Sequence, residues 1–174
     1  MKRGVRATEK DILEQVYRRY YKEALLYCMA LCGSMETAED LVADAFVKAY
    51  LSLPGEVPSF RYWLFRVCKN LWIDQLRKEK RLAEKEAAGK KDFAAEQNTP
   101  EKNFFKSEER RCLWEAIRSL MPEDREMVVL YWFSGVPLHE IAALQGKSYG
   151  AVRQRMHRVK EVLKKRMEEQ GYEF

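Results

Sequence analysis

The sequence lacks any uninterrupted apolar run of about 18 residues, the length that a membrane-spanning helix requires. Charged residues make up 34% of the chain and the mean hydropathy is −0.54, values typical of a protein that folds in water. The N-terminus is basic between Lys2 and Arg6, but the apolar stretch of a secretory signal does not follow it. We therefore expect a cytoplasmic protein without membrane insertion.

Histidine and cysteine are scarce, with two and four residues in the chain. No cysteine belongs to a CxxC pair or a His-rich zinc motif, and no paired-carboxylate metal site, phosphate-binding glycine loop or nucleophile–histidine arrangement is present. We therefore expect no enzyme activity, no metal, no cofactor and no disulfide. Cys28 and Cys32 have the spacing of one helix face, which leaves a metal or redox pair as the alternative to buried thiols.

The alternation of apolar and polar residues that marks a β-strand occurs nowhere in the chain, whereas apolar residues recur at helical spacing. Three helical runs occupy residues 8–81, and further runs occupy residues 107–170. Residues 82–106 consist mainly of Ala, Glu, Lys, Gln, Asn and Pro without a sustained period, which indicates a linker. The sequence thus predicts an all-α fold of two small helical domains joined by a flexible linker.

Capping residues mark the expected helix ends. Gly33 stops the first helix, Pro54 stops the second, and the third is expected to end near Arg81. The expected N-terminal caps are Thr8, Ser34, Ser59, Ser107 and Ser148.

Positive charge is concentrated in two stretches, although the net charge is only +5. Residues 61–81 carry seven Lys or Arg against two acidic residues, and residues 147–166 carry eight against one. The rest of the chain is therefore net acidic. Two basic patches on an otherwise acidic protein indicate that the chain binds a polyanion, most simply nucleic acid. The alternative is that both patches are helix faces that contact only solvent.

One side of the third helix combines cations with apolar side chains. Tyr62 and Ile73 share this side, which a face meant only for water rarely shows. A surface that binds a single strand pairs phosphate-binding cations with groups on which bases stack. We therefore favour single-stranded nucleic acid as its ligand over a solvated face. The stripe consists of Tyr62, Arg66, Lys69, Ile73, Arg77 and Lys80.

The C-terminal segment has the pattern of a helix-turn-helix, with a short helix from Leu138, a turn at Gly146 and a second helix capped by Ser148. In the second helix Val152, Met156, Val159 and Leu163 form the inward stripe. Arginine can pair with guanine and glutamine with adenine, so the opposite face can read base edges. The outward residues are Gly150, Arg153, Gln154, His157, Arg158 and Glu161. For His157, a histidine in the core is the alternative interpretation.

The second helix carries an acidic and aromatic surface that is unsuited to nucleic acid. Such a surface suits a protein partner. The alternative is a helix face that contacts only solvent. Its residues include Glu39, Asp40, Asp44 and Lys48 with Val42, Phe46 and Tyr50.

The segment AEDLVADAFVKAY over residues 38–50 is followed by FRYWLFRVCKN over residues 60–70 and then by the helix-turn-helix. In order, spacing and total length this combination resembles the sigma-70 family of bacterial RNA polymerase sigma factors. The resemblance is to the small extracytoplasmic-function (ECF) group, which keeps only region two and region four joined by a linker, and it covers nearly the whole chain. It implies an alternative sigma factor that brings core polymerase to promoters and opens the DNA, usually under anti-sigma control.

The resemblance also assigns roles and partners. The implied partners are promoter DNA, an anti-sigma factor, and core RNA polymerase through its beta-prime coiled coil and beta flap. Core binding falls on Glu39, Asp40, Asp44, Phe46, Lys48 and Tyr50. Minus-ten recognition and melting fall on Tyr62, Arg66, Lys69, Asn70, Ile73, Asp74 and Arg77, with the base pocket in the loop of residues 54–59. Minus-thirty-five recognition falls on Lys147, Ser148, Arg153, Gln154, His157 and Arg158.

One alternative remains from the residues alone. A free-standing helix-turn-helix regulator would bind duplex DNA without polymerase, usually as a dimer over two half-sites.

Overall fold

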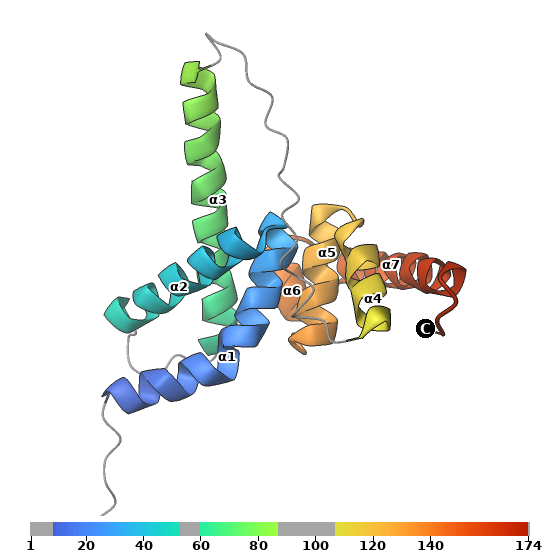
Figure 1. Ribbon diagram of the computed structural model, residues 1–174, viewed down its shortest axis with the longest axis horizontal. Helices are drawn as coiled ribbons and strands as arrows, with labels where there is room; N and C mark the ends of the chain where they lie inside the picture. The colour runs from blue at the N-terminus through green and yellow to red at the C-terminus, as the bar shows by residue number, and fades with distance from the viewer. Residues whose placement is uncertain (1–8, 53–59, 87–106, 174) are drawn as a thin grey trace, which may run out of the picture.

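Three long helices form the N-terminal half of the molecule. The computed structural model describes residues 9–52, 60–86 and 107–173. The first two ranges hold α1 (Glu9–Cys32), α2 (Met35–Ser52) and α3 (Phe60–Glu86) (Figure 1). Gly33 follows α1 with a φ of 73°, which glycine adopts without strain. The Ser34 hydroxyl accepts a hydrogen bond from the N–H of Thr37 at 3.4 Å, which confirms the predicted cap of α2.

The C-terminal half consists of short helices followed by one long helix. The short elements are α4 (Glu108–Arg118), α5 (Pro122–Val128), the π-helical turn η2 (Val129–Phe133) and α6 (Leu138–Gln145), and the long helix is α7 (Tyr149–Glu169). In the three ranges that the structure describes, no residue lies in a β-strand. The predicted all-α fold with two helical domains is therefore confirmed.

The predicted caps bound the C-terminal helices. The Ser107 hydroxyl accepts a hydrogen bond from the N–H of Arg110, and the Ser148 hydroxyl accepts one from the N–H of Ala151, both at 3.3 Å. Gly146 closes α6 in the left-handed conformation, with a φ of 64°. Helices α6 and α7 therefore meet in the expected helix-turn-helix.

Helix α3 is longer than its apolar pattern predicts. The pattern indicates an end near Arg81 and a linker from residue 82, whereas the helix continues to Glu86. Its last turns project away from the rest of the molecule in Figure 1. Lys, Arg, Glu, Leu and Ala are strong helix formers, and an ion pair of 3.8 Å joins Lys80 to Glu84, so these turns persist without packing. Four expected features lie outside the described residues: the cap Thr8, the cap Ser59, the loop 54–59 and the linker beyond residue 86.

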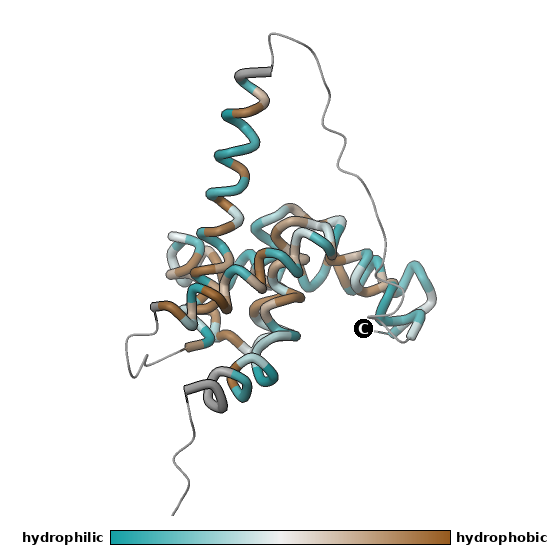
Figure 2. The backbone as a smooth tube through the Cα atoms, turned by 60° about the vertical axis from the view of Figure 1, so that its left-hand side comes forward, coloured by the Kyte–Doolittle hydropathy of each residue, from teal (hydrophilic) through white to brown (hydrophobic). Residues whose placement is uncertain are grey.

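Helices α1, α2 and α3 bury their apolar faces against one another. Ala24, Val42 and Leu64 have no exposed surface. Phe65, which lies outside the predicted basic stripe of α3, is also buried, and its ring centroid lies 5.0 Å from that of Tyr27. Figure 2 shows hydrophobic segments converging where the helices cross, while the projecting part of α3 is mostly hydrophilic.

The two halves of the molecule share one continuous core. The α5 helix and the η2 turn pack directly against α1. Met29 on α1 and Leu130 on η2 are both buried within the same apolar cluster. The two domains are therefore packed together in this structure, which the composition of the linker does not predict.

All four cysteines carry free thiols. Cys28 and Cys68 are buried, as expected, whereas Cys32 and Cys112 are only partly buried. The neighbouring Cys68 thiol and burial raise the pKa of Cys28, so this thiol stays protonated. Within the described ranges, no helix is both long and apolar enough to cross a membrane.

Candidate functional site

The basic stripe of α3 lies partly in solvent and partly at the boundary with the C-terminal half. Exposed cations alternate there with partly exposed apolar groups, the combination that a single nucleic-acid strand requires. Arg77 forms an ion pair of 3.3 Å with Asp74, but a pair between two exposed groups is weak and can exchange for a phosphate. Of the predicted minus-ten residues, Arg66, Asn70, Asp74 and Arg77 are exposed, whereas Tyr62, Lys69 and Ile73 are half-buried.

The ammonium group of Lys69 is bound to the C-terminal half of the molecule. Its Nζ donates to both carboxylate oxygens of Glu126 on α5, at 2.9 and 3.1 Å, and to the Leu144 carbonyl at 3.3 Å. Glu126 is only 4% exposed and also accepts a hydrogen bond of 2.7 Å from the Tyr27 hydroxyl. Burial and the nearby Glu126 raise the pKa of Tyr27 well above its ordinary value, so the hydroxyl remains a donor. The sequence gives no local signal for these contacts.

The second helix of the helix-turn-helix presents the predicted outward face. Arg153, Gln154, His157 and Arg158 are exposed, while the inward residues from Val152 to Leu163 are buried. Within the described part of the chain, no hydrogen bond or ion pair holds these four outward side chains. The face is therefore free to meet the edges of base pairs in a major groove.

Other cations of the C-terminal stretch hold the domain together. Arg155 donates to the carboxylates of Asp124 and Glu123, which fixes α7 to α5. The bond from Arg155, with help from Lys147, lowers the pKa of Glu123, and the bond to Asp124 raises the pKa of Arg155. Only the position of Arg155 three residues after the inward Val152 could have indicated this role.

Two further cations have partners inside the domain. Arg166 donates to the Ala116 carbonyl at 3.2 Å and to the Ser119 hydroxyl, which joins α7 to α4. Lys147, a predicted minus-thirty-five contact, is half-exposed and lies 4.0 Å from a carboxylate oxygen of Glu123. A count of the Lys and Arg residues in this stretch therefore overstates how many of them are available to DNA.

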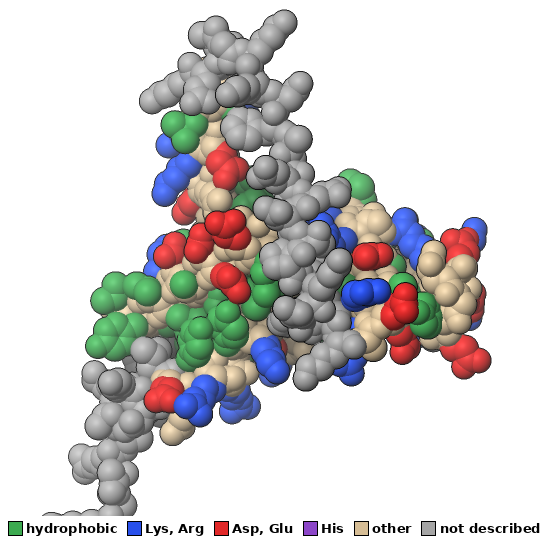
Figure 3. Space-filling model, viewed as in Figure 1, with side chains coloured by type: hydrophobic (Ala, Val, Ile, Leu, Met, Phe, Trp, Pro, Cys, Tyr) green, Lys and Arg blue, Asp and Glu red, His purple; other side chains and the backbone are tan. Residues whose placement is uncertain are grey.

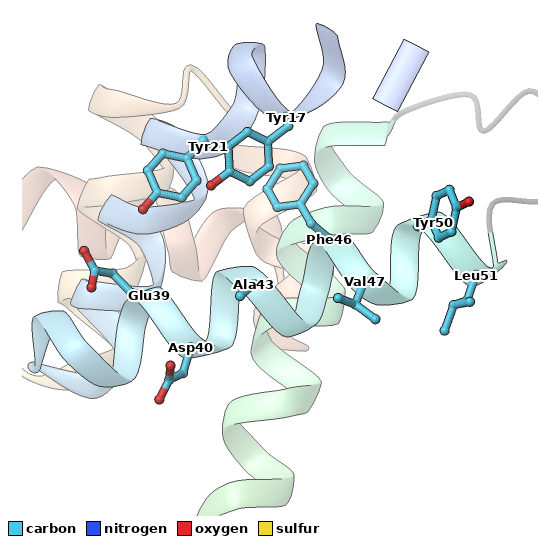
Figure 4. Close-up of a pocket in the computed structure, with 9 residues that line it drawn as sticks. All are labelled: Tyr17, Tyr21, Glu39, Asp40, Ala43, Phe46, Val47, Tyr50 and Leu51. Atoms are coloured by element: carbon cyan, nitrogen blue, oxygen red, sulfur yellow. The ribbon is translucent and has the colours of Figure 1, made fainter. Parts of the chain in front are cut away.

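An open groove runs between α1 and α2, with a volume of about 940 Å³ (Figure 4). Figure 3 shows hydrophobic side chains gathered over this part of the molecule, with acidic side chains beside them. Phe46 is almost buried, whereas Tyr50 is 62% exposed. The groove is lined by Tyr17, Tyr21, Glu39, Asp40, Ala43, Phe46, Val47, Tyr50 and Leu51. The predicted core-binding residues Asp44 and Lys48 are exposed on α2 outside this lining.

One wall of the groove comes from α1, which the sequence did not indicate. The Tyr17 ring lies 4.8 Å from the Phe46 ring and 4.9 Å from the Tyr21 ring, between centroids. Partial burial raises the pKa of Tyr21, and Tyr17 and Glu39 raise it further, so its hydroxyl stays protonated. The only available signal was the spacing of Tyr17 and Tyr21, which places them one turn apart on α1.

Comparison with known families assigns both halves of the chain. Sigma-70 region 2 matches residues 16–82, and Sigma-70 region 4 matches residues 110–163. The chain belongs to the sigma-70 family. In this sigma factor the basic stripe of α3 and the groove lie in region 2, and the helix-turn-helix lies in region 4.

Relatives assign the chain to the ECF group. It is 33% identical to the ECF RNA polymerase sigma factor SigE of Mycolicibacterium smegmatis over 87% of its own length, but it spans only 56% of that relative. It is 29% identical to the RNA polymerase sigma factor YlaC of Bacillus subtilis, covering 91% of this chain and 93% of the relative. The ECF RNA polymerase sigma factor SigW of the same organism is 27% identical over 94% of this chain and 92% of its own.

Solved structures share the fold. The sigma factor RpoE, in complex with the anti-sigma factor NepR from Bartonella quintana, matches with a TM-score of 0.68 and 22% identity, over 90% of this chain and 97% of that one. CnrH, in complex with the cytosolic domain of CnrY, matches with a TM-score of 0.57 and 24% identity, over 89% of this chain and 86% of that one.

Proposed function

We propose that this sigma factor acts in the cytoplasm, where it binds core RNA polymerase, recognises two promoter elements and opens the DNA for transcription initiation. The observation that carries this proposal is the presence of three unlike surfaces on one two-region chain. They are an acidic and aromatic groove on region 2, a cationic stripe with apolar members on α3, and an exposed helix-turn-helix face on region 4. The chain makes and breaks no covalent bond in this scheme, because the polymerase synthesises the RNA.

The groove between α1 and α2 is the proposed contact with core polymerase. Its floor is apolar, and its exposed acidic residues Glu39 and Asp40 suit an amphipathic partner helix with basic side chains. Aromatic residues with a polar tip, such as the exposed Tyr50, are typical anchors of protein interfaces. We assign this partner to the beta-prime coiled coil and the second polymerase contact, from region 4, to the beta flap.

Region 4 recognises a specific sequence in duplex DNA. Arg153 and Gln154 lie near the N-terminal end of α7, the part of a recognition helix that reaches base edges. Each good bidentate contact discriminates against a wrong base by about 1–3 kcal/mol. Their target is the minus-thirty-five element, which lies in closed duplex DNA.

Region 2 supplies the melting step. Extruding a base from a duplex costs a few kcal/mol, and a surface that binds only the opened strand offsets this cost. Arg66 and Arg77 can hold phosphates while the partly exposed Tyr62 and Ile73 contact unstacked bases. Recognition of the minus-ten element and opening of the DNA are then one coupled event.

An anti-sigma factor is the proposed regulator. RpoE is bound to such a factor in its solved structure, and CnrH is bound to the cytosolic domain of CnrY. We expect a partner of this class to compete with core polymerase for the groove of region 2, because one apolar groove cannot hold two helices at once.

Run-off transcription with purified core polymerase on genomic fragments tests the proposal. Discrete transcripts that require both the polymerase and this chain are expected. A gel shift of duplex DNA with the chain alone addresses the helix-turn-helix regulator. Tight sequence-specific binding without polymerase, together with no transcripts, would contradict the proposed function.

A further inference from the structure

Polar contacts join region 2 to region 4. They link residues of α1 or α3 to residues of α5, α6 or the turn after η2, so the packing of the two regions is specific rather than merely apolar. They include Lys69 and Tyr27 with the Glu126 carboxylate, Lys69 with the Leu144 carbonyl at 3.3 Å, Arg61 with the Ser134 carbonyl at 2.7 Å, and Arg125 with the Ala30 carbonyl at 3.4 Å.

Glu126 is the centre of this interface. Its Oε1 accepts bonds from Tyr27 and Lys69, and its Oε2 accepts bonds from Lys69 at 3.1 Å and from Gln145 at 3.3 Å. A buried carboxylate is unfavourable unless such partners satisfy it. Tyr27 and Lys69 both belong to region 2, so in a separated region 4 only Gln145 and water would remain as partners of this carboxylate. The bonding of Glu126 is thus complete only when the regions are packed together.

The pairing removes Lys69 from the DNA-binding stripe. An ammonium group has three N–H donors, and those of Lys69 face the two Glu126 oxygens and the Leu144 carbonyl. A phosphate approaching this position would also meet the negative charge of Glu126 within 3 Å of the ammonium. The neighbouring Arg66 and Asn70 remain exposed, so the obstruction is local to the side of α3 that faces region 4.

The interface is also of a kind that can open. Attraction within a buried ion pair is largely offset by the loss of hydration, so such a pair adds specificity more than stability. A phosphate backbone can replace Glu126 as the partner of Lys69 once the regions are apart. A partner that binds the separated regions would shift the population in the same direction.

We propose that region 4 inhibits the minus-ten surface of region 2 within the same chain, with Glu126 holding the Lys69 ammonium until the two regions separate. This inference rests on the proposed function, because the pairing inhibits only if the stripe binds DNA. The apparent affinity of the free chain for a single strand is then reduced in proportion to the small fraction of open molecules.

The test uses the full chain with Glu126→Gln, which removes the charge but keeps the size of the side chain. Glu115→Gln is the matched control, because Glu115 is exposed on α4 and loses the same charge. Tyr27→Phe removes the hydrogen bond to Glu126 from the region 2 side of the interface. It provides a second test if Glu126→Gln fails to fold. Three quantities are measured without polymerase: the radius of gyration by X-ray scattering, the acetylation rate of Lys69 relative to the exposed Lys78, and the affinity for a randomised 12-nucleotide single-stranded DNA.

The wild-type chain should be compact, with Lys69 acetylated much more slowly than Lys78. Glu126→Gln should increase the radius of gyration, bring the Lys69 rate to that of Lys78 and tighten DNA binding by about tenfold, while Glu115→Gln changes none of these. Equal acetylation of Lys69 and Lys78 in the wild-type chain would overturn the proposal. So would a variant that opens without gaining affinity for DNA.

Failure of this inference is distinguishable from failure of the proposed function. Scattering and acetylation measure the packing of the two regions in the free chain, without polymerase. Run-off transcription measures sigma activity with polymerase and does not depend on how the regions pack in the free chain. In the holoenzyme, Glu126→Gln should open promoters at the wild-type rate, because polymerase binding has already separated the two regions in this scheme. Loss of opening by this holoenzyme would assign Glu126 to the DNA-binding machinery and overturn the inhibitory role.

Discussion

Arg153 and Arg155 lie two residues apart on α7 and have different surroundings. Arg153 is exposed, and no hydrogen bond or ion pair within the described part of the chain engages it, whereas Arg155 donates to the carboxylates of Glu123 and Asp124. A single turn of α7 thus carries one cation that can meet DNA and one that fixes the helix to α5. The two residues should therefore respond differently to substitution.

Arg153→Ala and Gln154→Ala should each relax promoter preference at one position of the upstream element, by about 1–3 kcal/mol, because each loses a base contact. Lys164 is an exposed cation further along α7, which we assign to a phosphate. Lys164→Ala is the control, since loss of a phosphate contact weakens binding to all sequences evenly and lowers the salt slope by about one. Holoenzyme binding to a promoter library randomised in the upstream element measures both effects. Unchanged preferences for both variants would rule out the outward face of α7 as the reader.

Arg155→Met should leave promoter preference unchanged but destabilise region 4 by about 1–3 kcal/mol, because it removes charged hydrogen bonds between α7 and α5. Thermal unfolding of the full chain measures the loss. The variant should also raise the pKa of Glu123 toward its ordinary value of 4.5, since the bond from Arg155 is the main cause of its lowering.

The pH dependence of this bond has a definite sign. A lowered carboxyl pKa in the folded state contributes stability above 4.5, and this contribution is lost as the pH falls through the folded-state value. The stabilities of the wild-type chain and of Arg155→Met should therefore converge under acid conditions. A difference that stays constant from neutral pH to below the pKa of Glu123 would contradict the assignment.

Charge reversal on α2 should weaken the complex with core polymerase. Asp40→Lys combined with Asp44→Lys places positive charge on an exposed acidic surface, which should repel a basic partner helix and lower the affinity by tenfold or more, or roughly 1.4 kcal/mol. Glu79→Lys with Glu84→Lys makes the same change in charge on the exposed part of α3, outside both proposed polymerase contacts, and should have little effect. Titration of labelled core polymerase provides the measurement, and equal affinities for the two double variants would show that α2 is not the contact.

The α3 stripe should act after initial binding. A holoenzyme with Tyr62→Ala and Arg66→Ala should bind duplex promoters but open them more slowly, because stacking on an opened strand contributes about 1–3 kcal/mol per base. Lys78→Ala, a cation outside the stripe, is the control. The fluorescence of 2-aminopurine placed in the minus-ten element reports unstacking, and a normal rise in the double variant would remove the stripe from the melting step.

The sequence predicts the features that local interactions determine. Ser34, Ser107 and Ser148 cap helices as expected because each cap depends on a hydroxyl and an N–H three residues away. The buried stripe of α7 follows from helical spacing for the same reason. Helix α3 exceeds its expected end at Arg81 because helix propensity and an ion pair sustain it where the apolar pattern has stopped.

Tertiary pairing is what the sequence leaves undetermined. Lys69 and Glu126 are 57 residues apart, and each has the pattern of an ordinary exposed charge. The groove was only half predictable, since the pattern of α2 indicates its acidic and aromatic side but not that Tyr17 of α1 packs on Phe46. The assignments of individual residues to promoter DNA and polymerase stay predictions.

Permanganate reactivity of thymines in the minus-ten element, on a promoter identified by run-off transcription, shows whether this chain opens DNA together with polymerase. Single-stranded thymines react, so the measurement reports opening itself. Strong reactivity is expected only when core polymerase and this chain are present together, and none with either alone. Duplex-like protection of the element in the complete mixture, at concentrations where polymerase and the chain bind each other, would contradict the proposed function.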